Sequence, residues 1–102
     1  MAIEPQEIKR LTIRGVVQKI GFRAWTERKA LRLGLDGWVR NRLDGSVEIL
    51  VAGPRLAVTL LIEHCRSGPP LALVDSIEIE EASERDLSYR RNGETFSLLP
   101  TV

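Results

Sequence analysis

Apolar residues alternate with polar ones along some stretches of the chain and recur every three or four residues along others. From Ile8 to Val17 branched apolar residues alternate loosely with polar ones, a pattern typical of a β-strand. From Phe22 to Leu33 apolar residues recur at helical spacing, and Gly34 follows as a residue that can end a helix. We therefore expect a strand and a helix, joined by a short loop.

A hairpin and a second helix are expected in the middle of the chain. Segments 38–41 and 47–51 have strand-like composition and flank the pair Asp44-Gly45, which favours a tight turn. Gly53-Pro54 begins a second helical pattern, which stops at the Gly-Pro-Pro segment 68–70. The predicted packing face of this helix consists of Leu56, Leu60, Leu61 and His64.

The last third of the chain predicts a strand over 73–79 and a short final strand over 96–99. Between them, the polar segment 82–95 is expected to be a surface connection. The resulting order β-α-β-β-α-β is typical of a ferredoxin-like α+β sandwich, in which two helices cover one face of an antiparallel sheet. We expect residues 1–102 to form a single domain of this kind.

Composition limits the possible functions. The chain has 102 residues and is 43% hydrophobic, and its 15 Lys and Arg nearly balance its 14 Asp and Glu. So small a net charge gives no reason to expect nucleic acid or an anionic membrane as a partner. Residues 1–7 lack the pattern of a secretion signal, no apolar run could span a bilayer, and Cys65 is the single cysteine. We expect a cytoplasmic protein, a monomer by default, in which any anion site is local.

One loop carries the strongest functional signal. Glycines at positions 15 and 21 bound a turn between the first strand and the first helix, and Arg23 follows directly. Free N–H groups of such a turn and a guanidinium at a helix start can together bind a small anion. The simpler interpretation is a tight connection followed by a solvated helix arginine. Asn41, at the end of a predicted strand, could equally be an ordinary turn residue.

These residues form motifs that resemble the acylphosphatase family. The similarity runs from about Ile13 to Ile79. It rests on Gly15-Val16-Val17-Gln18, Gly21-Phe22-Arg23, Leu33-Gly34-Leu35, Gly37-Trp38-Val39-Arg40-Asn41 and Asp44-Gly45-Ser46-Val47-Glu48, with weaker support from Gly68-Pro69-Pro70 and Val74-Asp75. The resemblance implies hydrolysis of small-molecule acyl phosphates with no metal and no other cofactor. It implies that Arg23 binds phosphate and Asn41 holds the attacking water. The implied phosphate-binding residues are Val17, Gln18, Lys19, Ile20, Gly21, Phe22 and Arg23.

These roles also agree with the chemistry of the side chains. Because an acyl phosphate already carries a good leaving group, positioning a water and stabilising charge can suffice for hydrolysis. The fork of Arg23 can make two parallel bonds to phosphate oxygens, which a lysine cannot reproduce. The amide oxygen of Asn41 can accept a hydrogen bond from water and so direct the lone pair of the water oxygen, but the amide is no general base.

Lys19 departs from the family pattern, because the family usually has glycine at this point of the loop. Two outcomes are open. If the loop keeps a left-handed backbone there, lysine costs on the order of 1 kcal/mol, and otherwise the loop relaxes and presents its amides less well. The lysine could also add a cation beside the anion. A non-catalytic phosphate-sensing or partner-binding module is therefore the main alternative function, and RNA binding by the sheet is the weaker one.

The remaining candidates favour structural roles. Trp25, Trp38 and Phe22 are expected to be packing residues. His64 and Cys65 are sequence neighbours on a predicted helix, so their side chains point in different directions and do not form a nucleophile pair. Arg90-Arg91 is expected to be an exposed charge pair outside the site.

Overall fold

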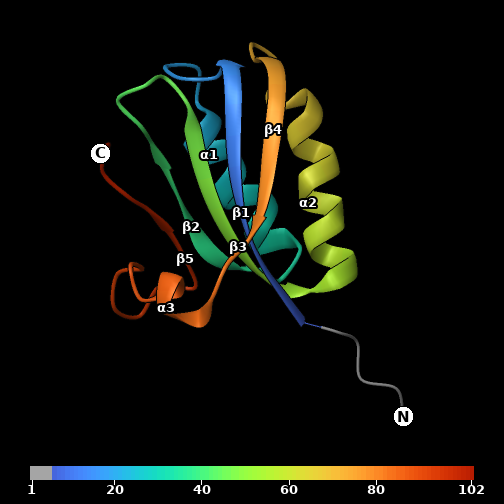
Figure 1. Ribbon diagram of the computed structural model, residues 1–102, viewed down its shortest axis with the longest axis vertical. Coiled ribbons are helices and arrows are strands. Elements are labelled where there is room, and N and C mark those ends of the chain that lie inside the picture. The colour runs from blue at the N-terminus through green and yellow to red at the C-terminus, as the bar shows by residue number, and fades with distance from the viewer. Residues whose placement is uncertain (1–5) are drawn as a thin grey trace.

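The computed structural model describes residues 6–102, so most of the segment searched for a secretion signal lies outside the described residues. These described residues form five strands and three helices, whose arrangement is drawn in Figure 1. In chain order they are β1 (Gln6–Val16), α1 (Phe22–Arg32), β2 (Asp36–Asn41), β3 (Val47–Pro54), α2 (Arg55–Ser67), β4 (Leu73–Glu81), α3 (Glu84–Leu87) and β5 (Phe96–Leu98).

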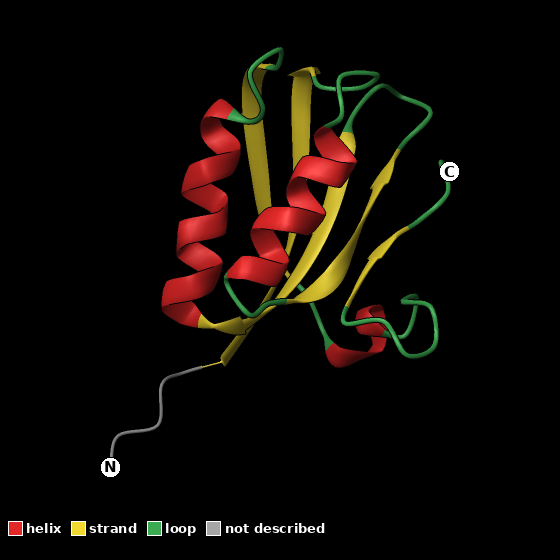
Figure 2. Cartoon of the chain, turned by 180° about the vertical axis from the view of Figure 1, so that it is seen from behind, coloured by secondary structure: helices red, strands yellow, loops and turns green. Residues whose placement is uncertain are grey.

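The strands form one sheet in the order β4-β1-β3-β2-β5. The first four of these pair antiparallel, and α1 and α2 lie side by side on one face, as Figure 2 shows. The predicted ferredoxin-like α+β fold is confirmed. The short strand expected at 96–99 is present as β5, but it pairs parallel to β2, so the complete sheet is mixed.

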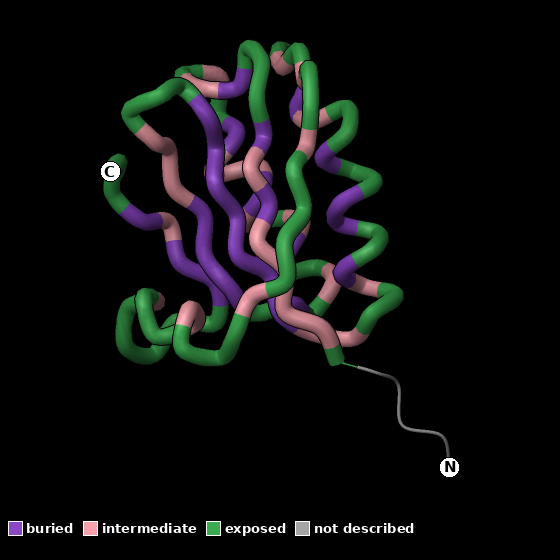
Figure 3. Tube along the Cα trace, in the orientation of Figure 1, coloured by how far each residue is buried: buried purple, intermediate pink, exposed green. Residues whose placement is uncertain are grey.

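The main core lies between the sheet and the two helices. Side chains alternate across the sheet, so that Leu11 and Ile13 of β1 and Ile49 and Val51 of β3 all face this layer and are fully buried. Figure 3 shows buried backbone concentrated in the central strands. Helix α1 contributes Phe22, as expected from its spacing. This packing fixes α1 against the end of the sheet where β1 leads into the helix.

The buried face of α2 differs from the prediction. Leu61 is buried as expected, but Leu56 and Leu60 are 62% and 42% exposed and His64 is also exposed. The buried residues are Val58, Leu61, Ile62 and Cys65. Their spacing of three, four and seven residues is that of one helical face, whereas the predicted set is centred on a neighbouring face and shares only Leu61 with it. Because α2 carries leucines on both sides, leucine positions alone pointed to the wrong face.

Segment 82–95 packs against one end of the other face of the sheet. Trp38, Leu50 and Leu99 form a second buried cluster there, against which Ala82 and Leu87 pack. The Trp38 indole N–H donates a 2.8 Å hydrogen bond to the carbonyl of Asp86. The prediction of a plain surface connection was therefore wrong in part, since the segment contains α3 and buries an aromatic side chain. Trp38 is a packing residue, as expected.

Candidate active site

The loop between β1 and α1 begins where β1 and β4 come unusually close. Gly15 has φ +131°, and a Cβ atom at this position would lie 2.1 Å from the carbonyl oxygen of Leu73. Only glycine permits this approach. Gly21 then ends the loop with φ +83° and ψ 16°, and α1 begins at the next residue. Gly15 is thus required by the close approach of the β4 backbone, and Gly21 adopts a left-handed conformation that glycine favours.

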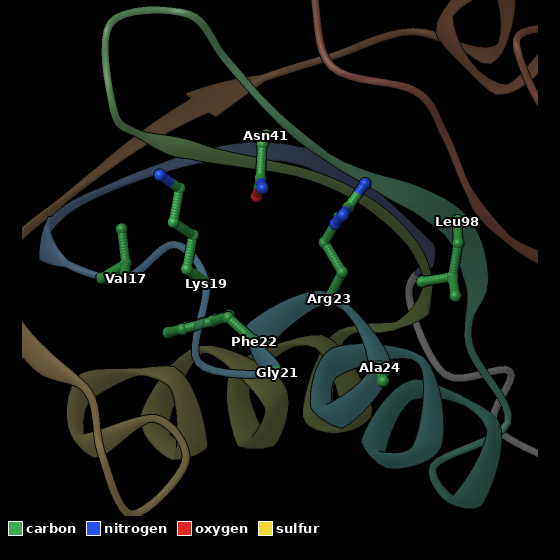
Figure 4. Close-up of a pocket in the computed structure, with 8 residues that line it drawn as sticks. All are labelled: Val17, Lys19, Gly21, Phe22, Arg23, Ala24, Asn41 and Leu98. Carbon is green, nitrogen blue, oxygen red and sulfur yellow. The ribbon is translucent and has the colours of Figure 1, made fainter.

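A cavity of about 300 Å³ opens beside this loop (Figure 4). It lies between the loop, the first turn of α1, the end of β2 and β5. The residues that line it are Val17, Lys19, Gly21, Phe22, Arg23, Ala24, Asn41 and Leu98. The structure therefore brings Asn41 together with five of the seven predicted phosphate-binding residues, Arg23 among them.

Gln18 and Ile20 belong to the predicted set but do not line the cavity. The Gln18 side chain extends to the β2–β3 hairpin, where its amide N–H₂ donates 2.8 Å hydrogen bonds to the carbonyls of Arg42 and Ser46. The Ile20 side chain packs against the main core. Only the backbone of these two residues is available to an anion, and the Gln18 side chain instead ties the loop to the hairpin.

The backbone of the loop offers unused hydrogen-bond donors. Within residues 6–102, none of the N–H groups of residues 18–23 donates to an acceptor. Some of them belong to the first turn of α1, where the helix dipole also favours negative charge. A run of free N–H groups beside a cavity is the arrangement by which loops and helix N-termini bind anions.

The guanidinium of Arg23 is held by a backbone carbonyl near the C-terminus. Its Nη1 donates to the carbonyl of Leu99 at 3.4 Å, and no carboxylate within residues 6–102 pairs with it. Leu98 lines the cavity beside it. Sequence reasoning missed this support from residues 98–99, because a backbone carbonyl is present at every residue and gives no signal in a sequence.

Asn41 is the last residue of β2, and its side chain points into the cavity (Figure 4). Its amide makes no hydrogen bond within residues 6–102, so it is free to bind a ligand or water. Its neighbours Arg40 and Arg42 lie on the other face of the sheet and both donate to Glu48 Oε1, at 2.6 and 3.2 Å. The Glu48 side chain in these ion pairs is only 9% exposed. The two ion pairs fix the end of β2 and therefore the direction of the Asn41 side chain.

Lys19 has φ +64°, the left-handed conformation that favours glycine. Of the two outcomes considered from the sequence, the loop has kept this conformation, and it has not relaxed around the lysine. The lysine side chain lines the cavity together with Arg23. Two cations therefore border the cavity, and none of the lining residues that the structure describes is acidic.

The other candidate chemistry receives no support from the described residues. Burial raises the pKa of the Cys65 thiol to about 12, so the group carries almost no thiolate near neutral pH. No group of three His, Cys, Asp or Glu side chains within residues 6–102 is arranged to hold a metal ion. In the same range, every helix is too short or too polar to cross a bilayer.

Comparisons with known proteins give a consistent result. A family model described as Acylphosphatase matches residues 9–93. An acylphosphatase of Nitrobacter winogradskyi is 54% identical over 95 residues, which cover 93% of this chain and 96% of the relative. The crystal structure of acylphosphatase from Bacillus subtilis aligns with a TM-score of 0.78 at 33% identity, covering 93% of this chain and 99% of that one. A structure of an acylphosphatase from Coxiella burnetii aligns with a TM-score of 0.81 at 30% identity, covering 97% and 100%.

Proposed function

Because the chain is an enzyme of the acylphosphatase family, we propose that it hydrolyses acyl phosphates to a carboxylate and phosphate in the cavity beside the 17–22 loop. In this proposal Arg23 and the loop hold the phosphoryl group, and Asn41 directs the attacking water. The observation that carries it is the convergence of a guanidinium, free backbone N–H groups and an unpaired carboxamide on one cavity.

Phosphoryl binding uses the two kinds of donor together. The planar guanidinium of Arg23 forms two parallel charge-assisted bonds to phosphoryl oxygens, about twice as strong as neutral hydrogen bonds. The N–H groups of residues 18–23 bind the remaining oxygens. Negative charge on the phosphoryl group is redistributed during the reaction. The Arg23 guanidinium and the loop N–H groups are already in place, so they stabilise this charge without reorganising. The carbonyl of Leu99 keeps the guanidinium at the cavity wall.

Asn41 acts on the water. Its side-chain oxygen accepts a hydrogen bond from one O–H of the water, so the water oxygen presents a lone pair to phosphorus. The bond from the water oxygen to phosphorus forms while the bond from phosphorus to the acyl oxygen breaks, and the carboxylate leaves with that electron pair. The proton released by the water passes to the phosphate or to solvent, because an amide cannot hold it.

The test is hydrolysis of benzoyl phosphate in the presence of a chelator, with wild type beside three variants. We expect Arg23→Ala to lower kcat/KM at least about 100-fold and to weaken inhibition by inorganic phosphate. Asn41→Ala should lower kcat about 100-fold while inhibition by phosphate is kept. Arg28→Ala, which removes an exposed arginine of the same helix, is the matched control and should behave as wild type.

The alternative is a phosphate-binding module without turnover. Lys19 is the observation that favours it, since its left-handed backbone places a large side chain in the loop. Such a module would bind inorganic phosphate through Arg23 but would leave benzoyl phosphate intact. Wild-type protein that binds phosphate and shows no hydrolysis would therefore replace the enzyme proposal with this alternative.

The same proposal includes the setting of the reaction. We take residues 1–102 as one catalytic domain that acts in the cytoplasm, as a monomer, on small-molecule acyl phosphates. The single cysteine is consistent with a reducing compartment. RNA binding is disfavoured because Trp38, on a central strand, is fully buried beneath segment 82–95 and cannot stack on a base.

A further inference from the structure

Lys19 is a charged group that the proposed reaction does not need. Its ammonium has no acidic partner within residues 6–102, and its side chain lines the same cavity as Arg23 and Asn41. Many other cations of this protein are paired with carboxylates, among them Arg10, Arg40 and Arg42 with Glu48. An unpaired cation held in a strained backbone position beside a ligand cavity is a reason to look for a function.

The phosphoryl group alone does not account for this charge. Arg23 supplies a charged fork, and residues 18–23 supply free N–H groups, so the phosphoryl oxygens already have ample donors. The cavity of about 300 Å³ corresponds to about ten water volumes, and a phosphoryl group fills only part of that space. The rest of the cavity and the positive charge of Lys19 are therefore available to the acyl part of the substrate.

The direction of the side chains separates the two cations. In Figure 4, Lys19 and Arg23 extend from the loop and the helix start on either side of Asn41, with their charged ends apart from one another. Arg23 is held by the Leu99 carbonyl, whereas Lys19 ends in a compact charge on a flexible stem. The Lys19 ammonium can therefore reach a negative charge of the substrate that lies at some distance from the phosphorus.

On the premise of the proposed function, we propose that Lys19 selects acyl phosphates whose acyl group carries a carboxylate of its own. The lysine ammonium binds that second carboxylate while Arg23 and the loop hold the phosphoryl group. Lys19 is then a specificity-determining residue, and the preferred substrates are acyl phosphates of dicarboxylic acids.

A matched pair of substrates tests this inference: benzoyl phosphate and 4-carboxybenzoyl phosphate, which differ by one carboxylate. The measured quantity is the ratio of their kcat/KM values, carboxylated over plain, for each protein. Any effect of a substitution on loop geometry or phosphoryl binding acts on both substrates and cancels in the ratio. We expect wild type to favour the carboxylated substrate about five-fold at low salt, with the preference decreasing as ionic strength rises.

Four variants separate the charge of Lys19 from its backbone strain. Lys19→Asn removes the charge and suits a left-handed backbone, and Lys19→Gly removes both charge and strain. Both should bring the ratio to about one. Lys19→Arg keeps the charge and should keep the preference, and Lys19→Glu should reverse it. A ratio that does not change in Lys19→Asn and Lys19→Gly overturns the inference.

The same comparison is made by calorimetry with benzylphosphonate and 4-carboxybenzylphosphonate, which cannot be hydrolysed. Tighter binding of the carboxylated compound by wild type, lost in Lys19→Asn, supports the inference even for protein without turnover. Equal binding of both compounds overturns it. Failure of the proposed function has a different signature, because wild type would then hydrolyse neither acyl phosphate.

Discussion

The Gln18 side chain provides the sharpest test of how the site is held together. It links the phosphate loop to the β2–β3 hairpin through two 2.8 Å hydrogen bonds, to the carbonyls of Arg42 and Ser46. The hairpin follows directly after Asn41, so this link sets the distance between the loop and the residue proposed to hold water. We expect Gln18→Ala to lower both stability and kcat.

The size of the stability loss follows from the partners of the two carbonyls. Each keeps one backbone donor after the substitution, since Gly45 N–H donates to Arg42 O at 3.0 Å and Arg42 N–H to Ser46 O at 2.9 Å. No buried acceptor is therefore left without a partner. The expected cost is the net value of two hydrogen bonds, about 2 kcal/mol, and not the larger penalty of an unsatisfied group. For a domain of this size that corresponds to a fall in Tm of about 10 °C.

Gln18→Glu is the matched variant, because it keeps the shape but turns a donor into a carboxylate that faces two carbonyl oxygens. Repulsion should make it less stable than Gln18→Ala at pH 7, and should raise the pKa of the introduced carboxyl above its usual value of about 4.3. A carboxyl with a raised pKa in the folded state favours folding when protonated. The defect should therefore shrink as pH falls through that raised pKa, and be smallest below about pH 4.

Urea unfolding of the three proteins at pH 7 and pH 4, beside kcat and KM for benzoyl phosphate, measures these effects. Gln18→Ala should lower the unfolding midpoint without changing the m-value, and should lower kcat more than it raises KM. A loss of less than about 0.5 kcal/mol in Gln18→Ala, or equal stability of the two variants at both pH values, would refute the reasoning.

Two further predictions concern single side chains. Replacing Lys19, at φ +64°, with glycine should raise the free energy of unfolding by about 1 kcal/mol, measured by urea unfolding, and an unchanged midpoint would contradict backbone strain at this position. Cys65, with a pKa of about 12, should react with a thiol-specific disulfide reagent at pH 8 at least about 100-fold more slowly in the folded protein than in urea. Equal rates would show that the thiol is accessible in the native state.

The sequence predicted the elements of the fold well because their signals are local. Strand alternation, helical spacing and the glycine and proline residues at the boundaries placed the two long helices and all five strands within a few residues. The face of α2 was mispredicted, and the packing of segment 82–95 against the sheet was missed although the segment lies on the surface as expected, because both depend on what packs against them. When a helix has leucines on both sides, its sequence does not indicate which side packs against the sheet. Ala82 and Leu87 can be identified as packing residues only once the structure places them against Trp38.

The candidate site shows the same division. Arg23 and the loop glycines could be selected because a turn bounded by glycines and followed by an arginine suits anion binding, whereas Asn41 was selected through the resemblance to the acylphosphatase family. The direction of the Gln18 side chain could not, since an amide serves equally well as ligand donor or structural link. The pairing of Arg40 and Arg42 with Glu48 also depends on β2 and β3 register, which places Arg40 opposite Glu48.

The site is thus held from three sides by segments that are far apart in the chain. Gln18 ties the loop to the hairpin, Glu48 holds both arginines next to Asn41, and the last residues run along β2, with Leu99 N–H bound to Val39 O at 2.9 Å and Val102 N–H to Asn41 O at 3.2 Å. Each contact constrains the backbone beside a group of the proposed mechanism. Catalysis by positioning depends on fixed distances between the groups of the site. Substitution of a residue that makes one of these contacts should therefore lower kcat, even though its side chain does not contact the substrate.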